Sequence, residues 1–487
     1  MCMLWQTGKE AGDLGQGVLI TLPENLKKII HIIEDAGFEA YAVGGCVRDS
    51  LLGRVPKDWD ITTSAKPPEV KKLFRRTVDT GLAHGTVTVL MGRESYEVTT
   101  YRIDGIYEDS RHPKNVEFTE LLSEDLRRRD FTINAMAYNE KSGLVDLYDG
   151  RADLDKGIVR AVGDPGERFN EDALRILRAF RFSAQLGFDI EEETKKKAGE
   201  LSFALKNISA ERIREELVRL LISPHPEKLY ELWQTGISGV ILPELDLMME
   251  TPQNNPHHKY SVGEHTIRAV CNIDHDEYSE EDLTILRLSM LFHDMGKPAC
   301  RMTDPDGIDH FKGHPEVSRD IARKVMSRLK FDNKTRDRVL SVVLYHDLRP
   351  SMTIPGMRKA IHTMGIDTAK YFVAVQRADI MAQSDFQRKE KEERVRVTAE
   401  YFGRIKENGD PLFIRDLAID GNDLKKAGIG EGKRIGDILT YLTNLVLDRP
   451  ELNEKARLLQ LAMAYRPDYA KKAEEMTGRY KPGAIVY

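Results

Sequence analysis

The stretch "KDWDIT" (Lys57–Thr62) holds two aspartates, Asp58 and Asp60, on either side of one tryptophan. The run is typical of a β-strand, in which residues i and i+2 point to the same face of the sheet. Two carboxylates side by side repel each other, and a divalent cation relieves that repulsion. Mg²⁺ prefers one or two carboxylates together with substrate phosphates. The stretch therefore predicts a strand that carries a metal site for chemistry on a phosphate.

Just upstream, the run "VGGCVRD" (Val43–Asp49) carries paired glycines at Gly44 and Gly45. Glycines let backbone N–H groups approach a phosphate closely, and the start of a helix attracts anions. Two nearby aspartates on their own are more often ordinary surface residues. Because the glycine turn and the acid pair favour the same chemistry, together they indicate metal-assisted nucleotidyl transfer.

The composition bounds the class of protein. The chain has 487 residues and a net charge of −6, which predicts two to four folded domains and no global basic field for nucleic acid. The four cysteines are scattered and match neither a zinc spacing nor a disulfide framework. The sequence has the pattern of neither a signal peptide nor a membrane span, so we expect a cytoplasmic protein without membrane contact.

Periodicity divides the chain into an α/β part followed by helices. An amphipathic helix is predicted over 24–38, strands over 39–43 and 59–62, and a hairpin made of His84–Leu90 and Tyr96–Arg102. Beyond about residue 163 the pattern is helical. The run "TPQNNPHH" (Thr251–His258) is typical of a linker.

Four ordered motifs occupy roughly the first 220 residues. They are "YAVGGCVRDSLLGRVPKDWDITTSA" (Tyr41–Ala65), "LRRRDFTINAMA" (Leu126–Ala137), "EDALRILRAFRF" (Glu171–Phe182) and "SAERIREEL" (Ser209–Leu217). The set resembles the class II tRNA nucleotidyltransferases, the family of bacterial CCA-adding enzymes and poly(A) polymerases within the DNA polymerase beta superfamily. The resemblance implies a polymerase beta-like α/β head in which Asp58 and Asp60 hold catalytic Mg²⁺. It also implies a third carboxylate on a neighbouring strand, for which Glu97 is the best placed.

The motif "EDALRILR" (Glu171–Arg178) indicates how a protein selects a base without a template strand. Asp172 and Arg175 are three residues apart, so on a helix they share a face. Cytosine and adenine both offer an amino donor beside a ring-nitrogen acceptor, and uracil and guanine offer the reverse. Asp accepts hydrogen bonds and Arg donates them, so the pair would accept C and A. The alternative is a surface ion pair, but the resemblance implies a protein template for CTP and ATP.

The expected nucleotide-binding residues lie in these motifs, and the resemblance implies that Arg129 and Asp130 contact the triphosphate and the ribose. Phe131 is expected in the core. The full set is Gly44, Gly45, Arg48, Arg129, Asp130, Asn134, Asp172, Arg175 and Arg178. The run "HGTVTV" resembles the CCA-adding branch, and the polar loop Arg102–Pro113 resembles a flexible loop that full CCA-adding and A-adding enzymes keep. The loop argues against a CC-adding enzyme and leaves those two open.

The second half carries a series of histidines and aspartates in helical sequence. Imidazole and carboxylate ligands together suit Zn, Mn, Fe or Ni. The series resembles the HD phosphohydrolase superfamily, which implies the core ligands His265, His293, Asp294 and Asp379 and, as in two-metal members, the extra ligands His314 and His346. The alternative is a set of structural histidines, which is the usual role of any single one.

These observations predict an α/β head followed by all-α regions. The expected parts are a nucleotidyltransferase head over 1–163, a helical neck over 164–250, an HD domain over 251–400 and a helical tail over 401–487. The expected function is addition of C, C and A to tRNA 3′ ends from CTP and ATP, with phosphohydrolase chemistry at the HD site. The alternatives are an A-adding enzyme or poly(A) polymerase and, in another class, an HD phosphohydrolase whose head only binds nucleotide or RNA. The oligomeric state stays open.

Overall fold

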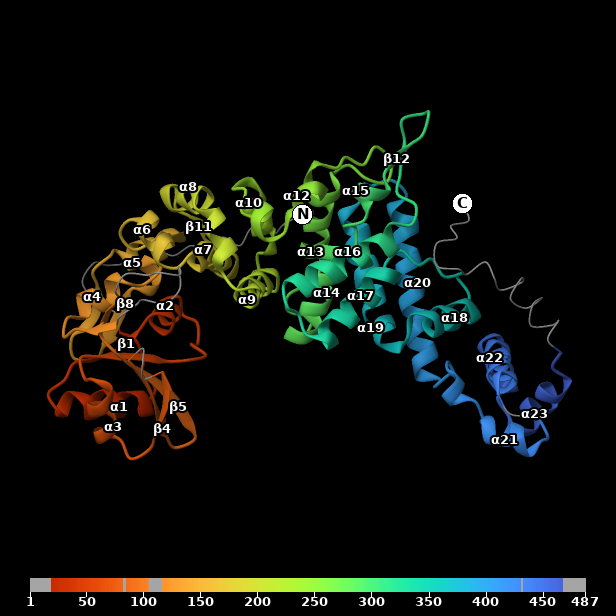
Figure 1. Ribbon diagram of the computed structural model, residues 1–487, viewed down its shortest axis with the longest axis horizontal. Helices are drawn as coiled ribbons and strands as arrows, with labels where there is room; N and C mark the ends of the chain where they lie inside the picture. The colour runs from red at the N-terminus through yellow and green to blue at the C-terminus, as the bar shows by residue number, and fades with distance from the viewer. Residues whose placement is uncertain (1–18, 82–84, 105–115, 431, 467–487) are drawn as a thin grey trace. The chain divides into compact units, whose positions relative to one another are not determined.

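The computed structural model describes residues 19–81, 85–104, 116–430 and 432–466 (Figure 1). The chain divides into two compact units, Met1–Ser209 and Ala210–Tyr487. The first unit has mixed α/β structure and the second is almost entirely helical, in agreement with the predicted fold class. The division falls inside the predicted neck, and the four-part boundaries stay a prediction. Within the described residues, no helix is both long and apolar enough to cross a membrane.

The first unit is built on a seven-stranded mixed sheet with the order β3-β4-β5-β2-β1-β8-β9. The strands are β1 (Ala40–Val43), β2 (Asp60–Thr63), β3 (Thr77–Gly81), β4 (Thr86–Met91), β5 (Glu94–Thr100), β8 (Met136–Asn139) and β9 (Gly143–Asp146). Neighbours run antiparallel except β2 and β5, which are parallel. The predicted hairpin is confirmed as β4 and β5, although His84 lies outside the described residues, as do residues 105–113 of the predicted flexible loop.

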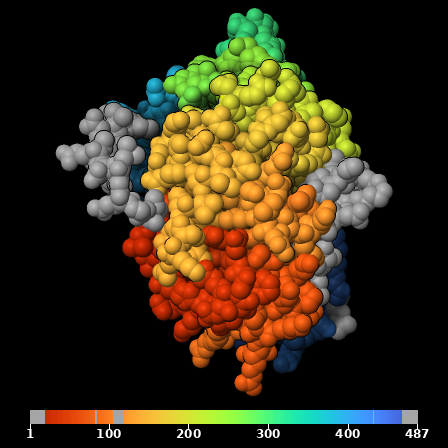
Figure 2. All heavy atoms as spheres, turned by 90° about the vertical axis from the view of Figure 1, so that its left-hand side faces the viewer, coloured from red at the N-terminus to blue at the C-terminus, as the bar shows by residue number. Residues whose placement is uncertain are grey.

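Helices pack on this sheet because their apolar residues recur at helical spacing. α1 (Glu24–Asp35) buries Leu26, Ile29, Ile30 and Ile33, a stripe that the sequence predicted. The other helices of the unit are α2 (Gly45–Leu51), α3 (Pro67–Leu73), α4 (Leu122–Arg127), α5 (Gly150–Lys156), α6 (Pro165–Glu171), α7 (Leu174–Leu186) and α8 (Glu192–Glu200). Short strand pairs join β6 (Arg102–Asp104) to β7 (Val116–Phe118) and β10 (Ile158–Val159) to β11 (Asp189–Ile190). Figure 2 shows the amber and yellow α5–α8 region lying against the red and orange sheet region.

The described residues of the second unit form packed helices and one short hairpin. Its helices are α9 (Ala210–Leu221), α10 (Leu229–Gln234), α11 (Ser238–Ile241), α12 (Pro243–Glu250), α13 (Val262–Cys271), α14 (Glu280–Phe292), α15 (Lys297–Cys300), α16 (His314–Arg328), α17 (Asn333–Tyr345), α18 (Ile354–Met364), α19 (Ile366–Ala382), α20 (Arg388–Glu407), α21 (Gly421–Lys426), α22 (Lys433–Asp448) and α23 (Lys455–Ala464), and the hairpin is β12 (Met302–Thr303) and β13 (Asp309–His310). Helices α13, α14, α17 and α19 pack together at the centre. The fully buried Arg287 of α14 donates to the carbonyls of Leu221, Ser223 and Ile273, which ties the end of α9 to this centre.

The prediction of a linker over Thr251–His258 is wrong. The backbone N–H of Asn254 donates to Asp309 at 2.9 Å, and buried Gln253 accepts from Lys297 at 2.8 Å. The N–H of Ser384 donates to the carbonyl of His257 at 2.9 Å. The segment is irregular, as its prolines and asparagines indicate, but it is packed into the unit. These residues favour turns in packed loops as well as in free ones.

Candidate functional site

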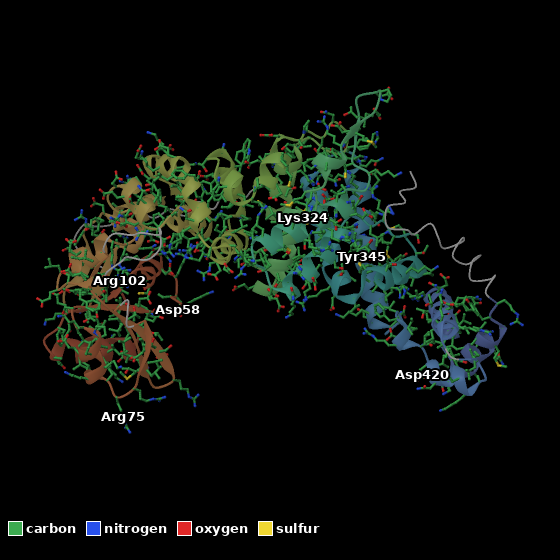
Figure 3. All side chains as sticks on the ribbon, viewed as in Figure 1. Asp58, Arg75, Arg102, Lys324, Tyr345 and Asp420 are labelled. Carbon is green, nitrogen blue, oxygen red and sulfur yellow. The ribbon has the colours of Figure 1, made fainter. Side chains whose placement is uncertain are left out.

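The two predicted acids of the head lie at the start of β2. Asp60 opens the strand and stands opposite Glu97 in the parallel pair with β5. Asp58 lies in the segment before the strand, where its side chain is exposed (Figure 3), so the prediction that both lie within a strand is wrong. Partial desolvation raises the pKa of Asp60, Arg129 opposes this shift, and Glu97 and Asp58 add to the rise. The three carboxylates therefore act on one another.

These carboxylates form a wider group than a preassembled metal site. Among the described residues, the groups whose ligand atoms all lie within 4.8 Å of one another belong to the second unit and do not include Asp58, Asp60 or Glu97. Burial is the main cause of the raised pKa of Asp60, and repulsion from Glu97 and Asp58, which a divalent cation relieves, adds to it. Carboxylate oxygens suit a hard ion that completes its shell with water and phosphates. The donor set fits a divalent ion that arrives with a nucleotide.

The glycine turn lies against an arginine. Gly44 has φ +82°, a conformation that glycine adopts without strain. A Cβ at Gly44 would lie 3.0 Å from Nη1 of Arg129, so a larger residue would displace the guanidinium. Since Arg129 also lowers the pKa of Asp60, the turn, the arginine and the acid lie together at one site.

Four of the predicted nucleotide-binding residues form one hydrogen-bonded chain. Arg48 donates to Asn134 at 2.6 Å, and Asn134 donates to Asp130 at 3.1 Å. Arg178 donates to the second oxygen of Asp130 through Nε at 2.8 Å and Nη2 at 2.6 Å. Burial alone would raise the pKa of Asp130, but Arg178 and Asn134 outweigh it and hold that pKa well below its usual range. The chain is therefore a preformed network of charge-assisted bonds.

One aromatic ring, that of Phe182, contacts two arginines of this hydrogen-bonded network, and the sequence did not lead us to predict it. Phe182 has three guanidinium groups near its ring centroid, those of Arg181 at 4.0 Å, Arg48 at 5.2 Å and Arg178 at 5.5 Å. Its ring also meets Phe131 edge-on at 5.8 Å, and Phe131 is fully buried as predicted. The alternation of arginine and phenylalanine in "RAFRF" was the available signal, because such pairs form cation–π contacts.

The predicted base-reading pair is arranged differently from the prediction. α6 ends at Glu171 and α7 begins at Leu174, so Asp172 lies in the break between two helices and does not share a helix face with Arg175. The Asp172 carboxylate accepts from the N–H of Leu174 at 3.0 Å, since aspartate competes for the first free N–H groups of a helix. Arg175 is buried, pairs with Glu171 at 2.5 Å and donates to two backbone carbonyls. Both side chains are held rigidly at the start of α7.

A fully buried acid supports the arginines of the second motif. Asp125 accepts from Arg128 at 2.7 Å and from Arg129 at 3.3 Å. It also accepts from the hydroxyl of Thr62 in β2 at 3.0 Å. Asp125 thus fixes Arg129 relative to the strand that carries Asp60. The sequence held a signal for this role, because arginines three and four residues after an acid share its helix face.

The six predicted HD residues converge in the second unit. His265 lies on α13 and Asp379 on α19, and His293 with Asp294 directly follows α14. The two neighbours therefore lie beyond a helix end and not within a helix as predicted. His314 is the first residue of α16, and His346 directly follows α17. Helix ends deliver four of the six side chains, because the chain there turns away and leaves them pointing inward.

The four imidazoles present the same nitrogen to the centre. Each Nδ1 lies near a backbone carbonyl: His265 with Ala382 at 3.3 Å, His293 with Met290 at 2.6 Å, His314 with Phe311 at 2.9 Å and His346 with Val343 at 2.7 Å. A carbonyl only accepts, so Nδ1 carries the proton and the Nε2 lone pair is left for a ligand. This tautomer pattern fits metal binding.

Asp294 joins two sets of ligands. Its Oδ2 lies 3.1 Å from Nε2 of His293 and 3.5 Å from that of His265. Its Oδ1 lies 3.3 Å from His314 and 3.8 Å from His346. Asp379 lies 2.9 Å from His265, which closes the first set. Two groups, His265–His293–Asp294 and Asp294–His314–His346, have the compactness of metal sites, and one carboxylate shared between them fits a two-metal centre.

The electrostatics of this centre are those of a site that needs cations. Burial lowers the pKa of His293, but Asp294 and Asp379 outweigh it and raise that pKa to about 10. Burial, followed by His293 and His314, lowers the pKa of His346 to about 4. Without metal, the two carboxylates thus favour a proton on His293, which a bound cation would replace, whereas burial and the neighbouring imidazoles keep His346 neutral.

Several groups around the centre were missed by sequence reasoning. Lys297 is buried, lies 2.8 Å from Asp294 and donates to Gln253. The ring of His258 lies 5.0 Å from that of His265, and its buried Nδ1 has no hydrogen-bond partner among the residues that the structure describes. Lys297 lies four residues after His293 in the sequence, whereas Gln253 and His258 lie in the segment predicted to be a linker.

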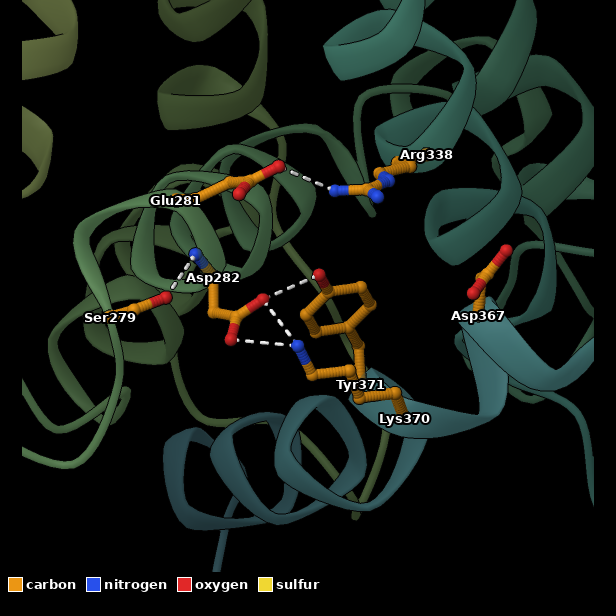
Figure 4. Close-up of a pocket in the computed structure, with 7 residues that line it drawn as sticks. All are labelled: Ser279, Glu281, Asp282, Arg338, Asp367, Lys370 and Tyr371. Atoms are coloured by element: carbon orange, nitrogen blue, oxygen red, sulfur yellow. Dashed lines mark hydrogen bonds and ion pairs between the residues drawn. The ribbon is translucent and has the colours of Figure 1, made fainter.

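A polar surface pocket of the second unit has a structural explanation (Figure 4). Lys370 pairs with Asp282 at 2.6 Å, and Tyr371 donates to the same carboxylate at 2.7 Å. Arg338 pairs with Glu281 at 2.8 Å. These bonds join the start of α14 to α17 and α19, so the pocket is a polar joint between helices.

Comparison with known proteins defines the class of this chain. Three family models match, "Poly A polymerase head domain" over residues 40–160, "Probable RNA and SrmB- binding site of polymerase A" over 187–249 and "HD domain" over 258–399. The chain is thus a nucleotidyltransferase head joined to an HD domain. Nucleotidyltransferases of this family use a divalent metal, and the chain has further candidate metal ligands in the HD domain.

The chain belongs to the family of CCA-adding enzymes, as its relatives show. A CCA-adding enzyme of Ligilactobacillus salivarius is 50% identical over 454 residues, which is 91% of this chain and 98% of the relative. One of Lactobacillus helveticus is 54% identical over 205 residues. In that match the chain spans about half of the relative, 51%. The crystal structure of a Bacillus stearothermophilus CCA-adding enzyme with CTP superposes with a TM-score of 0.69 at 27% identity, over 93% of this chain and 98% of that one.

Proposed function

We propose that this chain adds CMP, CMP and AMP in turn to tRNA 3′ ends, taking them from CTP and ATP. The observation that carries the proposal is the parallel pairing of β2 with β5, which sets Asp60 opposite Glu97 beside Arg129 and the Gly44 turn. Membership in the CCA-adding family supports the product. It favours full CCA addition over the rival A-adding and poly(A) reactions.

In this reaction the 3′ hydroxyl oxygen of tRNA forms a bond to the α-phosphorus of the nucleotide. The bond from that phosphorus to the oxygen of the β-phosphate breaks, pyrophosphate leaves and the hydroxyl proton passes to solvent. Asp58, Asp60 and Glu97 would hold Mg²⁺, which when bound neutralises charge on the phosphates. Arg129 adds a fixed positive charge, because Asp125 holds its guanidinium.

Base choice is proposed for Asp172 and Arg175. Their positions at the start of α7 are fixed by the cap bond to Leu174 and by the pair with Glu171. The bonds described for Arg175 use three of its five N–H groups. A rigid donor and a rigid acceptor discriminate better than mobile ones, because they cannot turn to suit the wrong edge.

The test is incubation of the full chain with tRNA that lacks its last three nucleotides and with each labelled nucleotide in turn. We expect two CMP additions with CTP alone, AMP addition only after them, and none with UTP or GTP. An enzyme that adds no CMP to this tRNA but adds AMP to tRNA already ending in CC would be an A-adding enzyme. If no nucleotide is added under any condition, the remaining candidate is the protein whose head only binds RNA or nucleotide.

The HD centre supports a second activity, hydrolysis of a phosphate ester. Its four tautomer-fixed imidazoles and two carboxylates would hold transition-metal ions, of which Mn, Ni, Fe and Zn suit the donor set. In such hydrolysis water adds to phosphorus, the ester oxygen leaves, and one proton passes from water to that oxygen. The test is elemental analysis of the purified protein with an assay on a 2′,3′-cyclic phosphate. A protein without metal and without activity under added Mn or Ni would make these histidines structural.

A further inference from the structure

The HD centre opens to solvent on the side of Asp379. The Asp379 side chain is 24% exposed, whereas those of the other five members are between 1% and 11% exposed. A substrate therefore approaches along Asp379, and the side chains around that residue form the entrance.

A lysine stands at this entrance two hydrogen bonds from the centre. Gln383, one turn after Asp379 on α19, donates to its Oδ2 at 2.9 Å. The oxygen of the same amide accepts from Nζ of Lys391 at 2.8 Å. Among the described residues, no carboxylate lies within ion-pair distance of Lys391. Its ammonium is therefore oriented by a neutral amide and is available to an anion.

An aromatic pair lies beside this lysine. The ring of Phe386 meets that of His257 edge-on at 4.9 Å, and Phe386 is 45% exposed. Ser384 holds the two segments together. Its N–H donates to the carbonyl of His257 at 2.9 Å, and its hydroxyl donates to the carbonyl of Pro256 at 2.5 Å. Burial lowers the pKa of His257, and the nearby charge of Lys391 lowers it further. An exposed ring beside a cation is the usual platform for a nucleotide.

We propose that the entrance of the HD centre binds a nucleoside 3′-phosphate, with Lys391 on the phosphate and Phe386 stacked on the base. The inference rests on the proposed phosphohydrolase function and names the substrate class of that site. Stacking accepts every base, because each has a π-face. The entrance thus differs from the head in reading no base edge. The same chemistry occurs at the end of an RNA and in a free nucleotide.

The test is calorimetric titration of the full chain with uridine 3′-monophosphate, with inorganic phosphate and with a short RNA ending in a 3′-phosphate. Uridine is chosen because the head is proposed to reject uracil. Lys391→Ala is expected to weaken all three ligands about tenfold, and Phe386→Ala only the nucleotide and the RNA, by about tenfold. Phe386→Trp, which keeps an aromatic ring, is expected to bind the nucleotide and the RNA as the unaltered protein does. Lys389→Ala, an exposed lysine on the same helix, is the matched control and leaves all three unchanged.

Absence of uridine 3′-monophosphate binding, or equal binding by every variant, would overturn the inference. Tighter binding of the RNA than of the nucleotide identifies an RNA end as the ligand, and equal binding identifies a free nucleotide. Metal content, measured on the same samples, separates the two proposals. Bound metal with unaltered affinities in the variants refutes only this entrance. A protein without metal that cleaves no cyclic phosphate refutes the phosphohydrolase, and Lys391-dependent binding would then still support the nucleotide pocket.

Discussion

The two candidate sites of this molecule solve the problem of gathering carboxylates in opposite ways. In the head, Asp58 and Asp60 are exposed, and the ordered part is the buried network of Arg48, Asn134 and Asp130 beside them. In the HD centre the ligands themselves are buried, and each imidazole is fixed by a backbone carbonyl. The difference indicates whether the cation would be bound by the protein alone or together with a nucleotide. If the proposed functions hold, the head orders contacts for a nucleotide that brings its metal, whereas the HD centre orders ligands for the metal itself.

The head carboxylates are the strongest test of this difference. Asp60→Ala or Asp58→Ala is expected to lower the rate of nucleotide addition roughly a thousandfold, because several kcal/mol of charge stabilisation on the phosphates is lost. Binding of tRNA is expected to persist, since it depends on shape and phosphate contacts. The measurement is single-turnover incorporation together with tRNA binding.

Asp79→Ala is the matched control for these variants. Asp79 is an exposed aspartate of the same sheet that pairs with Lys71, and its loss should leave the rate of nucleotide addition unchanged. Normal incorporation by the Asp60 variant would remove the head carboxylates from the reaction.

The HD centre is expected to lose its metal when its shared ligand is removed. His293→Ala combined with Asp294→Ala takes ligands from both three-membered groups, so bound metal and cyclic-phosphate cleavage should both disappear. Nucleotide addition is expected to stay within about twofold, because the head lies in a separate compact unit. In the intact protein, metal binding should weaken as the pH falls, because protons compete with the metal for the imidazoles, and His293, whose pKa is raised to about 10, takes up a proton first.

The surface pair His275 and Asp276 provides the control for the HD variant. These neighbours contact each other at 2.8 Å, and both are exposed, so His275→Ala with Asp276→Ala changes the same residue types without touching the centre. Retained metal in the HD variant, or metal loss in this control, would contradict the assignment.

Residue patterns predicted the elements of the head better than the joints between them. The β4–β5 hairpin and the buried stripe of α1 follow from local periodicity, which needs no knowledge of the rest of the fold. The break at Asp172 was missed, because a side-chain cap and a helix-forming sequence compete there and tertiary contacts of Arg175 decide the outcome.

The candidate sites show the same division. The six HD residues are chemically distinctive, so the sequence indicated them although they are up to 114 positions apart, from His265 to Asp379. Asp125 and Gln383 are ordinary residue types whose role depends on what lies opposite. Such partners are fixed by long-range packing, which periodicity does not carry.

Base selection tests whether the rigid start of α7 reads the nucleotide. Asp172→Asn keeps the cap on α7, because asparagine caps as well as aspartate, but it adds an amide donor to the edge that faces the base. Discrimination of CTP over UTP is expected to fall about ten- to a hundredfold, the range of one bidentate contact. The measurement is the ratio of kcat/KM for the two nucleotides. Asp164→Asn, at the cap of α6, should not alter it, and strict selectivity in the Asp172 variant would put base choice elsewhere.

The smallest expected effect concerns the stability of the head network. The pKa of Asp130 is lower in the folded protein than its ordinary value of about 4. As the pH falls, the unfolded chain therefore takes up the proton first, so the contribution of Asp130 is full above about pH 4 and is lost below it. Asp130→Asn is expected to cost about 2 kcal/mol at pH 7, less than a fully buried pair because Arg178 is partly exposed. Hydrogen exchange of the β8 amides at pH 7 and pH 3 measures the gap in unfolding free energy between the unaltered protein and the Asp130→Asn variant. This gap should narrow in acid. Asp155→Asn, in an exposed pair with Arg151, should give a gap below about 0.5 kcal/mol at either pH, and an Asp130 gap that is constant with pH would mean that its charge does not stabilise the network.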